Sequence, residues 1–326
     1  MTSKIMITGA AGFIGSHLVE RTLELGNEIY ACDIIPIKKC NNLKNVSSHK
    51  KFHYLQGDIT DDQFLREYYQ SNADVIYHLA SVVGVQNYMS DPLHLIDVTV
   101  NGTKKLLHLA SQHKTRFIFS STSEIYGKNP EVPWMETSDR VLGSTSVDRW
   151  SYSTSKAVCE HMLYGLYRKN KFPFSIVRFF NVYGPRQSPI YVASKSIYQI
   201  LNGKSPYLYD NGKQTRCFTY ISDIIDGLIS VWQSDKAVGE AFNLGNQNEN
   251  SINELINIII ECSGKQITST EFNTKKEYGE MYEDIPRRVP NAEKAETLLN
   301  WKAKIKLKEG VEKTIRWARE NRWWLA

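Results

Sequence analysis

The chain has 326 residues, of which 41% are hydrophobic and 23% charged, and its formal net charge is +5. This length and apolar content suffice for a sizeable core in one large or two closely joined domains and exclude a disordered chain. The basic residues form no Lys/Arg block, so we expect neither nucleic acid nor a membrane as a partner. Five scattered cysteines lack the spacing of a metal site or a disulfide framework, and no apolar run approaches the roughly 20 residues of a membrane span. We therefore expect a soluble, cytoplasmic protein without a bound metal.

Short apolar runs alternate with longer amphipathic stretches through the first 180 residues. Such alternation predicts a parallel sheet with helices on both faces and ligands at the carboxyl ends of its strands. We expect an α/β, doubly wound Rossmann-type fold. The expected strands are Lys4–Thr8, Glu28–Asp33, Phe52–Gln56, Asp74–Leu79, Arg116–Ser120 and Phe174–Phe180, and the expected helices are Ile14–Leu25, Asp61–Gln70, Val98–His113 and Tyr152–Lys169.

The chain beyond residue 181 predicts shorter and less regular elements. Gly184 and Pro185 interrupt regular structure, and we place a soft boundary near residue 181 that separates residues 1–180 from residues 181–326. The second part is expected to be a smaller α/β domain that can return strands or helices to the first. Ser251 and Glu254 have the spacing of a capping box. The expected elements are a hairpin near Asp210–Gly212 and helices at Ser194–Asn202, Asp223–Gln233, Ser251–Cys262 and Val311–Asn321.

Three glycines follow the first predicted strand in the segment Thr8–Gly15, directly before a predicted helix. Glycines allow a tight turn there and a close approach of pyrophosphate to the backbone, at the positive end of the helix. Asp33 ends the second strand roughly 20 positions later, where a carboxylate accepts from the adenosine ribose and repels a 2′-phosphate. The pattern predicts NAD rather than NADP. The expected cofactor contacts are Gly9, Gly12, Phe13, Ile14, Gly15, Asp33, Asp58, Ile59, Leu79, Ala80, Tyr152 and Lys156.

Asp58 follows the third predicted strand and has two interpretations. Its carboxylate could accept from the adenine amino group, or it could cap the next helix. Nothing in the surrounding sequence decides between the two.

Tyr152 and Lys156 lie one turn apart on a predicted helix, so their side chains share a face. There an ammonium would favour the phenolate and lower the tyrosine pKa from its ordinary value of about 10. A tyrosine ionised in this way is a general base. The spacing alone is common in structural helices, but with the glycine loop and the cluster Ser120–Thr122 it predicts redox chemistry.

Four segments together resemble the extended short-chain dehydrogenase/reductase family, in its nucleotide-sugar branch. The resemblance implies a seven-stranded or similar Rossmann domain over residues 1–180, with tightly held NAD that is reduced and reoxidised within one cycle. It also implies that residues 181–326 mainly grip a nucleoside diphosphate sugar, and that a homodimer packs through the helices near Val98–His113 and Tyr152–Lys169. The four segments are Thr8–Gly15, Ser120–Thr122, Tyr152–Lys156 and Arg178–Arg186, and the likeness covers nearly the whole chain.

The same resemblance implies roles for single residues. Thr122 would hydrogen-bond the sugar 4-hydroxyl while Tyr152 takes its proton and NAD oxidises C4. Asn181 and Arg216 would face the diphosphate, an anion that suits a guanidinium, although Arg216 could also be a surface charge. The expected substrate contacts are Asn181, Arg186, Tyr209 and Arg216.

The triplet Thr122-Ser123-Glu124 bears on which sugar reaction follows oxidation at C4. Typical 4,6-dehydratases carry Thr-Asp-Glu, in which the Asp protonates the departing 6-hydroxyl. A serine hydroxyl is a poor acid, but a C6 carboxylate needs no such acid, because a 4-ketone makes the substrate a β-keto acid. Thr-Ser-Glu is similar to the UDP-glucuronic acid decarboxylases, although GDP-mannose 4,6-dehydratases also carry it.

A late arginine tips the choice toward decarboxylation. Arg288-Val289-Pro290 matches an arginine of those decarboxylases that acts near C5, with Arg287 as a possible stand-in, although Arg288 could instead be a solvated loop charge. We expect decarboxylation of UDP-glucuronic acid or its N-acetylamino relative. A 4,6-dehydratase, a 4-epimerase and a regulatory NAD-binding protein are the alternatives. The expected catalytic residues are Thr122, Ser123, Glu124, Tyr152, Lys156 and Arg288.

Overall fold

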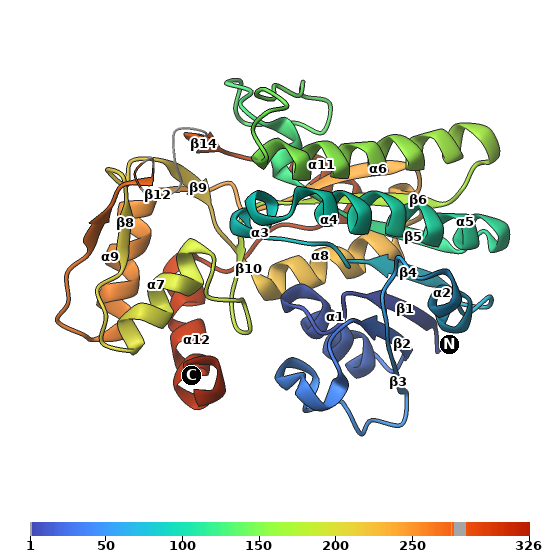
Figure 1. Cartoon of the computed structure of the whole chain (residues 1–326), viewed down its shortest axis with the longest axis horizontal. Coiled ribbons are helices and arrows are strands. Elements are labelled where there is room, and N and C mark those ends of the chain that lie inside the picture. Colours follow the sequence, from blue (N-terminus) through green and yellow to red (C-terminus); the bar gives the residue numbers. More distant parts are fainter. Residues whose placement is uncertain (1, 275, 277–284) are drawn as a thin grey trace.

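The structure of the chain is a computed structural model that describes residues 2–274, 276 and 285–326. Its centre is a seven-stranded parallel sheet, as the sequence predicts for an α/β fold (Figure 1). The order of the strands reverses between β1 and β4, which is where ligands bind in folds of this kind. From one edge to the other the strands are β11 (Glu240–Leu244), β6 (Phe174–Phe179), β5 (Arg116–Thr122), β4 (Val75–His78), β1 (Lys4–Thr8), β2 (Glu28–Asp33) and β3 (Phe52–Gln56).

The sheet is covered on both faces, so its central strands are buried on both sides and consist of nearly continuous apolar runs. Two hydrophobic clusters lie on the two faces. In Figure 1, α5 and α6 lie over one face and α1 and α8 lie over the other. The helices of these layers are α1 (Phe13–Glu24), α2 (Asp62–Tyr68), α4 (Pro92–Ile96), α5 (Thr103–His113), α6 (Arg149–Asn170), α8 (Ile221–Gln233) and α11 (Glu293–Leu299).

The helix expected at Val98–His113 differs from the structure. The helical segment begins earlier, at Pro92, because proline fits the first helical position and Asp91 accepts from the backbone N–H of His94 at 2.9 Å. One turn of π-helix over Asp97–Gly102 then joins α4 to α5. The other expected helices, and the six expected strands, agree with the structure to within four residues at each end.

The expected hairpin near Asp210–Gly212 is wrong. Asp210 and Gly212 do reverse the chain, with φ of 53° and 65°, but the flanking strands do not pair with each other. Strand β8 pairs with β13, and β9 pairs with β12 and β14. The strands concerned are β8 (Tyr207–Tyr209), β9 (Thr215–Cys217), β12 (Glu249–Ser251), β13 (Thr270–Phe272) and β14 (Arg287–Arg288).

The chain after residue 181 belongs partly to the central sheet, since β11 pairs with β6 and α8 packs against α1. The predicted capping box is confirmed: Ser251 accepts from the backbone N–H of Glu254 at 3.1 Å, and Glu254 accepts from that of Ser251 at 2.7 Å. The remaining elements are α3 (Val85–Ser90), β7 (Val182–Tyr183), α7 (Val192–Leu201), β10 (Thr219–Tyr220), α9 (Ile252–Ser263), α12 (Leu307–Glu320) and six short helical turns: Ile37–Lys39, Asn41–Leu43, the π-helical turn Asp97–Gly102, Ser123–Tyr126, Asp235–Ala237 and Arg322–Trp324.

Candidate active site

The glycine loop lies at the switch point, between β1 and α1. Gly9 has φ +72°, and a Cβ there would stand 2.7 Å from the backbone nitrogen of Ala80. A Cβ on Gly15 would overlap the carbonyl oxygen of Gly9, so both positions require glycine. Gly12 directly precedes α1, whose first N–H groups have no partner within the helix and whose positive end favours an anion. This cradle fits the pyrophosphate of NAD. The first turn of α1 holds the other two predicted cradle residues, Phe13 and Ile14.

Asp33 lies at the end of β2, next to the glycine loop. Its Oδ2 accepts from the backbone N–H of Ala11 at 3.0 Å and its Oδ1 from that of Ile35 at 3.2 Å. Burial raises the pKa of Asp33 above its ordinary value, and these N–H donors oppose the rise. The carboxylate is therefore fixed at the loop, where the sequence places the adenosine ribose.

Asp58 and Ile59 follow β3. Asp58 accepts from the backbone N–H and the hydroxyl of Thr60, both at 2.8 Å, whereas the cap of α2 is Asp61. The alternative that Asp58 caps the next helix is thus wrong. Ile59 is buried, and a Cβ on Gly102 would stand 2.6 Å from its Cδ1.

The end of β4 is tied to the glycine loop through polar side chains. Ala80 donates its backbone N–H to Thr8 Oγ1 at 3.2 Å, and Leu79 precedes it. The same hydroxyl lies 2.7 Å from Nδ1 of His78, whose Nε2 lies 2.9 Å from Thr103 Oγ1. Burial lowers the pKa of His78 to about 3, so this histidine is neutral.

Tyr152 and Lys156 lie on the same face of α6, beside Thr122 at the end of β5. Lys156 Nζ donates to the carbonyl of Ser120 at 2.8 Å and lies 5.9 Å from the centre of the Tyr152 ring. The Tyr152 ring stacks on that of Tyr88, with 4.6 Å between the ring centres. Tyr152, Lys156 and Thr122 therefore lie close together at the end of β5.

The expected lowering of the Tyr152 pKa is wrong for the protein by itself. Burial raises that pKa well above its ordinary value, Tyr191 and Glu124 add to the rise, and a hydrogen bond with Thr122 opposes it. Burial also lowers the pKa of Lys156 to about 8, against the influence of Cys159 and Glu160. Desolvation thus dominates the pKa of both side chains.

Glu124 is held between buried guanidinium groups. Arg288 Nη2 lies 2.6 Å from its Oε1, and Arg149 Nη2 lies 3.3 Å from the same oxygen. Burial alone would raise the pKa of Glu124, but Arg149 and Arg288 outweigh it and bring the pKa down to about 2. The carboxylate is therefore ionised throughout the ordinary pH range. Its neighbour Ser123 is buried as well.

Arg287 and Arg288, the two residues of β14, have different environments. Arg288 is 7% exposed and lies in register with the buried Arg216 on β9. Arg287 points outward and pairs with Glu249 at 2.8 Å. The alternatives that Arg288 is a solvated loop charge, that Arg216 is a surface charge, and that Arg287 stands in for Arg288 are therefore wrong.

Arg149 was not among the expected site residues. It precedes Tyr152 by three positions, so the two side chains share one face of a helix. That spacing is the sequence signal that could have identified it.

The other predicted substrate contacts lie outside the group around Glu124. Arg186 Nη2 pairs with both carboxylate oxygens of Glu20 on α1 at 2.7 Å. Tyr209 packs against Phe272, with 5.0 Å between ring centres. Asn181 has φ 32°, and its buried Oδ1 has no hydrogen-bond partner within the described residues.

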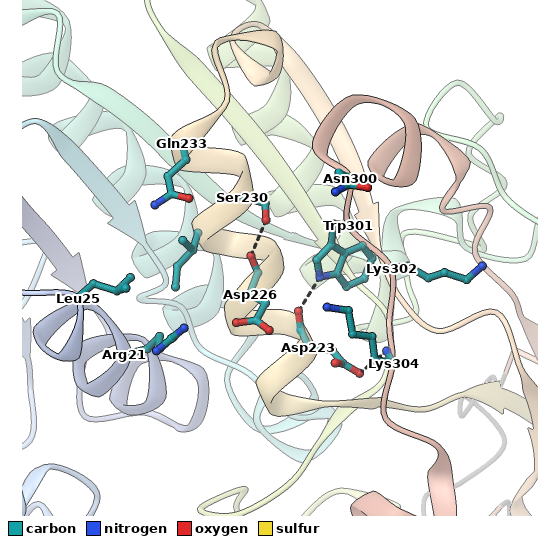
Figure 2. A pocket seen from close by; sticks show the side chains of 11 residues that line it. Arg21, Leu25, Asp223, Asp226, Ser230, Gln233, Asn300, Trp301, Lys302 and Lys304 are labelled. Atoms are coloured by element: carbon teal, nitrogen blue, oxygen red, sulfur yellow. Dashed lines mark hydrogen bonds between the residues drawn. The ribbon is translucent and has the colours of Figure 1, made fainter.

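A surface hollow lies elsewhere, between α1, α8 and the segment that follows α11 (Figure 2). The Trp301 indole donates to the carbonyl of Asp223 at 2.7 Å, and the Asp223 carboxylate accepts from the backbone N–H groups of Lys304 and Ile305. These bonds fix the segment on α8. None of the predicted site residues lines this hollow. The residues that line it are Arg21, Leu25, Asp223, Asp226, Ile229, Ser230, Gln233, Asn300, Trp301, Lys302 and Lys304.

Within residues 2–274, 276 and 285–326, no helix is long and apolar enough to cross a membrane. Over the same residues, no three His, Cys, Asp or Glu side chains are grouped so that they could hold a metal ion.

The sheet, the glycine cradle and the Tyr152/Lys156 pair define an NAD-dependent enzyme of the short-chain dehydrogenase/reductase type. The family model described as GDP-mannose 4,6 dehydratase matches residues 6–314. The chain belongs to the extended short-chain dehydrogenase/reductase family, in its NAD-dependent epimerase/dehydratase branch, and NAD is its cofactor.

Two relatives of the chain are named as decarboxylases. The chain is 34% identical to the UDP-N-acetyl-alpha-D-glucosaminuronate decarboxylase of Bacillus cytotoxicus, over 98% of this chain and 99% of the relative. It is 33% identical to the UDP-glucuronic acid decarboxylase 1 of Xenopus tropicalis, over 98% of this chain and 72% of that protein.

Solved structures with the same fold include other reactions. The UDP-glucuronic acid 4-epimerase of Bacillus cereus, in complex with UDP-glucuronic acid and NAD, has a TM-score of 0.86 and 29% identity over 98% of this chain and 99% of the other. The dTDP-glucose 4,6-dehydratase of Bacillus anthracis, in complex with NAD, has a TM-score of 0.85 and 26% identity over 99% and 98%. The fold therefore gives the family and the cofactor, and the reaction depends on the site.

Proposed function

We propose that the protein decarboxylates a UDP-hexuronic acid, either UDP-glucuronic acid or its N-acetylamino relative, through a 4-keto intermediate. The observation that supports this most is the buried group of Arg149, Arg216 and Arg288 around Glu124. Guanidinium groups bind carboxylates and phosphates with two parallel hydrogen bonds. A substrate that brings its own carboxylate and diphosphate therefore suits a site built from buried arginines. The decarboxylase relatives support the same choice.

The residues that serve the oxidation at C4 are Thr122, Tyr152 and Lys156. Thr122 and Tyr152 share a hydrogen bond, so both can contact a sugar 4-hydroxyl placed between them. Tyr152 acts as the base once ionised, and the charge on Lys156 favours that ionised form against burial. The cradle of Gly9, Gly12 and Gly15 would hold NAD, which would supply hydride transfer for the oxidation at C4 and for the later reduction.

Loss of CO2 follows from the ketone at C4. The C5–C6 bond breaks, its electron pair moves into the enolate that C4 and C5 form with the ketone oxygen, and C5 then takes up a proton. Arg149 and Arg288 hold the carboxylate in place, and Ser123 lies beside them. Glu124 carries no proton near neutral pH because its pKa is about 2. It therefore carries no proton for a departing 6-hydroxyl, and Ser123 stands where typical 4,6-dehydratases carry their acidic Asp.

The two alternatives give different products. A 4,6-dehydratase would remove water from a neutral nucleotide sugar, whereas a 4-epimerase would return a product of unchanged mass with C4 inverted. The test incubates the protein and NAD with UDP-glucuronic acid, its N-acetylamino relative and neutral UDP- and GDP-hexoses, and it measures CO2, product mass and the configuration at C4. CO2 from a uronic acid supports the proposal. Water loss or inversion without CO2 overturns it.

We propose that residues 1–180 hold NAD and the catalytic residues, while residues 181–326 mainly hold the nucleotide sugar. Two observations support this division. The buried amide oxygen of Asn181 has no hydrogen-bond partner within the described residues, and the buried guanidinium of Arg216 lies beside Arg288. Tyr209 offers an aromatic face to a base. Arg186 pairs with Glu20 through Nη2, and its buried Nη1, which has no hydrogen-bond partner within the described residues, could contact the substrate.

We further propose a homodimer that packs through α4, α5 and α6. Leu93 and Ile96 on α4 are 77% and 40% exposed, and Val158 on α6 is 38% exposed. Helices α4 and α6 contact each other, so these apolar side chains share one side of the molecule. Exposed apolar groups that gather on one side are typical of interfaces between subunits.

We propose the cytoplasm as its location. All five cysteines are free thiols, as expected for a reducing compartment.

A further inference from the structure

A series of buried hydrogen bonds runs behind the active site, beginning one helical turn beyond Lys156. There Glu160 Oε1 accepts from Ser121 Oγ at 2.5 Å and from Arg178 Nε at 3.0 Å, and its Oε2 accepts from Arg178 Nη2 at 2.6 Å. Glu160 and Arg178 are each 6% exposed. Two parallel bonds of this kind fix both distance and orientation, so α6, β5 and β6 are joined at this point.

The series continues from Arg178 to the segment that carries Arg288. Arg178 Nη1 donates to Tyr126 Oη at 2.8 Å, and Tyr126 Oη donates to Asn243 Oδ1 at 2.7 Å. Asn243 Nδ2 then donates to the carbonyl of Asn291 at 3.2 Å, three residues after Arg288. Both Tyr126 and Asn243 are fully buried. One connected set of bonds therefore runs from α6, the helix that carries the redox pair, to the segment that carries Arg288.

We propose that Glu160 and Arg178 are positioning residues, whose ion pair fixes the turn Thr122–Glu124 against Tyr152 and Lys156. Neither side chain belongs to the group that contacts the sugar in the proposed mechanism. A buried ion pair is in general a poor source of stability, since well-packed apolar residues can replace it. Its value here is geometric, because Ser121 directly precedes Thr122 and Tyr126 follows Glu124 by two positions. The inference rests on the proposed function only for the identity of the sugar.

The charge of Glu160 also acts on Lys156. The titratable groups that face Lys156 are Tyr152, Cys159 and Glu160 on α6 and His78 on β4, and β5 offers the Ser120 carbonyl. Burial lowers the pKa of Lys156 to about 8, and Cys159 and Glu160 oppose that decrease. Removing the Glu160 charge should therefore move the Lys156 pKa to lower pH.

The test compares Glu160→Gln, Ser121→Ala and Tyr126→Phe with the control Tyr77→Phe. Tyr77 is also a fully buried tyrosine with one hydrogen bond, but its bond goes to the Leu228 carbonyl on α8. The measurement is a single turnover of NAD reduction against pH, with KM for the nucleotide sugar and thermal unfolding beside it. Oxidation at C4 is common to decarboxylase, dehydratase and epimerase. An incorrect sugar assignment therefore shows in the products, and an incorrect positioning role shows in the rates.

We expect Glu160→Gln to lower the rate of NAD reduction about 100-fold and to shift the alkaline limb of its pH profile to lower pH. Ser121→Ala and Tyr126→Phe should lower the rate of NAD reduction about 10-fold. They should leave KM little changed and should not shift the alkaline limb of the pH profile. Tyr77→Phe should match the parent. The proposal would be overturned if Glu160→Gln reduced NAD at the parent's rate and with the same alkaline limb in its pH profile. Should Glu160→Gln fail to fold, a Ser121→Ala rate equal to that of Tyr77→Phe would do the same.

Discussion

Two adjacent arginines, Arg287 and Arg288, have opposite environments. The Arg287 side chain is 57% exposed and pairs with Glu249, while the Arg288 side chain is 9% exposed and contacts Glu124. Because neighbouring residues of a strand point to opposite sides, only one of the two can enter the site. This contrast provides a matched pair of variants.

Arg288→Met should lower kcat/KM for the uronic acid at least 100-fold, since it leaves a buried Glu124 with less compensation and removes a cation from the site. Arg287→Met should stay within about threefold of the parent, because exposed pairs contribute little. Steady-state kinetics on both variants check this. Equal losses in the two variants would contradict the assignment of Arg288.

The ionised state of Glu124 also predicts a dependence of stability on pH. Its pKa is lowered to about 2 in the folded protein, so its contribution is present above the unfolded pKa of about 4.3 and is lost as pH falls toward 2. Urea unfolding of the parent and Glu124→Gln should therefore differ most at neutral pH, and the difference should shrink between about pH 4.5 and pH 2. A difference that does not change with pH would contradict the lowered pKa.

At the scale of elements, α1 depends on the glycines before it. Gly15→Ala should abolish NAD binding, because the added Cβ would overlap the carbonyl of Gly9. Gly165→Ala on α6 is the matched control, since nothing lies within 4 Å of its added Cβ. That variant should bind NAD normally and gain up to about 1 kcal/mol in the free energy of unfolding. Titration with NAD followed by fluorescence, and thermal unfolding, measure the two outcomes.

The elements that local patterns describe were predicted well, and those that depend on distant pairing were not. The first three strands of the sheet end where their apolar runs end, and Ser251 caps α9 through residues three positions apart. The hairpin failed because β8 and β9 each pair with strands far along the chain. No local signal of Asp210 or Gly212 contains that information.

The same division holds for the site. Thr122, Tyr152 and Lys156 follow from spacing and resemblance, and the structure brings them together. The burial of Arg288 depends on the pairing of β14 with β9, which spacing does not reveal. Arg149 was missed because a charge three positions before a tyrosine is common on helices. The raised pKa of Tyr152 reflects burial, which the sequence does not quantify.

At the scale of the whole molecule, the proposed homodimer can be tested by introducing a charged side chain into its expected interface. Val158→Arg places a cation among the exposed apolar side chains of α4 and α6 and should yield monomers. Leu25→Arg is the control, because Leu25 is similarly exposed, at 44%, but follows α1 on the other face of the sheet. Light scattering at matched concentrations gives the mass. A dimer in both variants would place the interface elsewhere.

The two-residue strand β14 has a consequence for the tolerance of the enzyme to error. A slip of one position along β9 would exchange the inward and outward residues of such a strand. In this chain both residues are arginine, so a slip that moves Arg287 into the place of Arg288 would still present a guanidinium to the interior. We expect such a slip to preserve the charge of the site, although in the structure itself Arg288 contacts Glu124 and Arg287 lies outside.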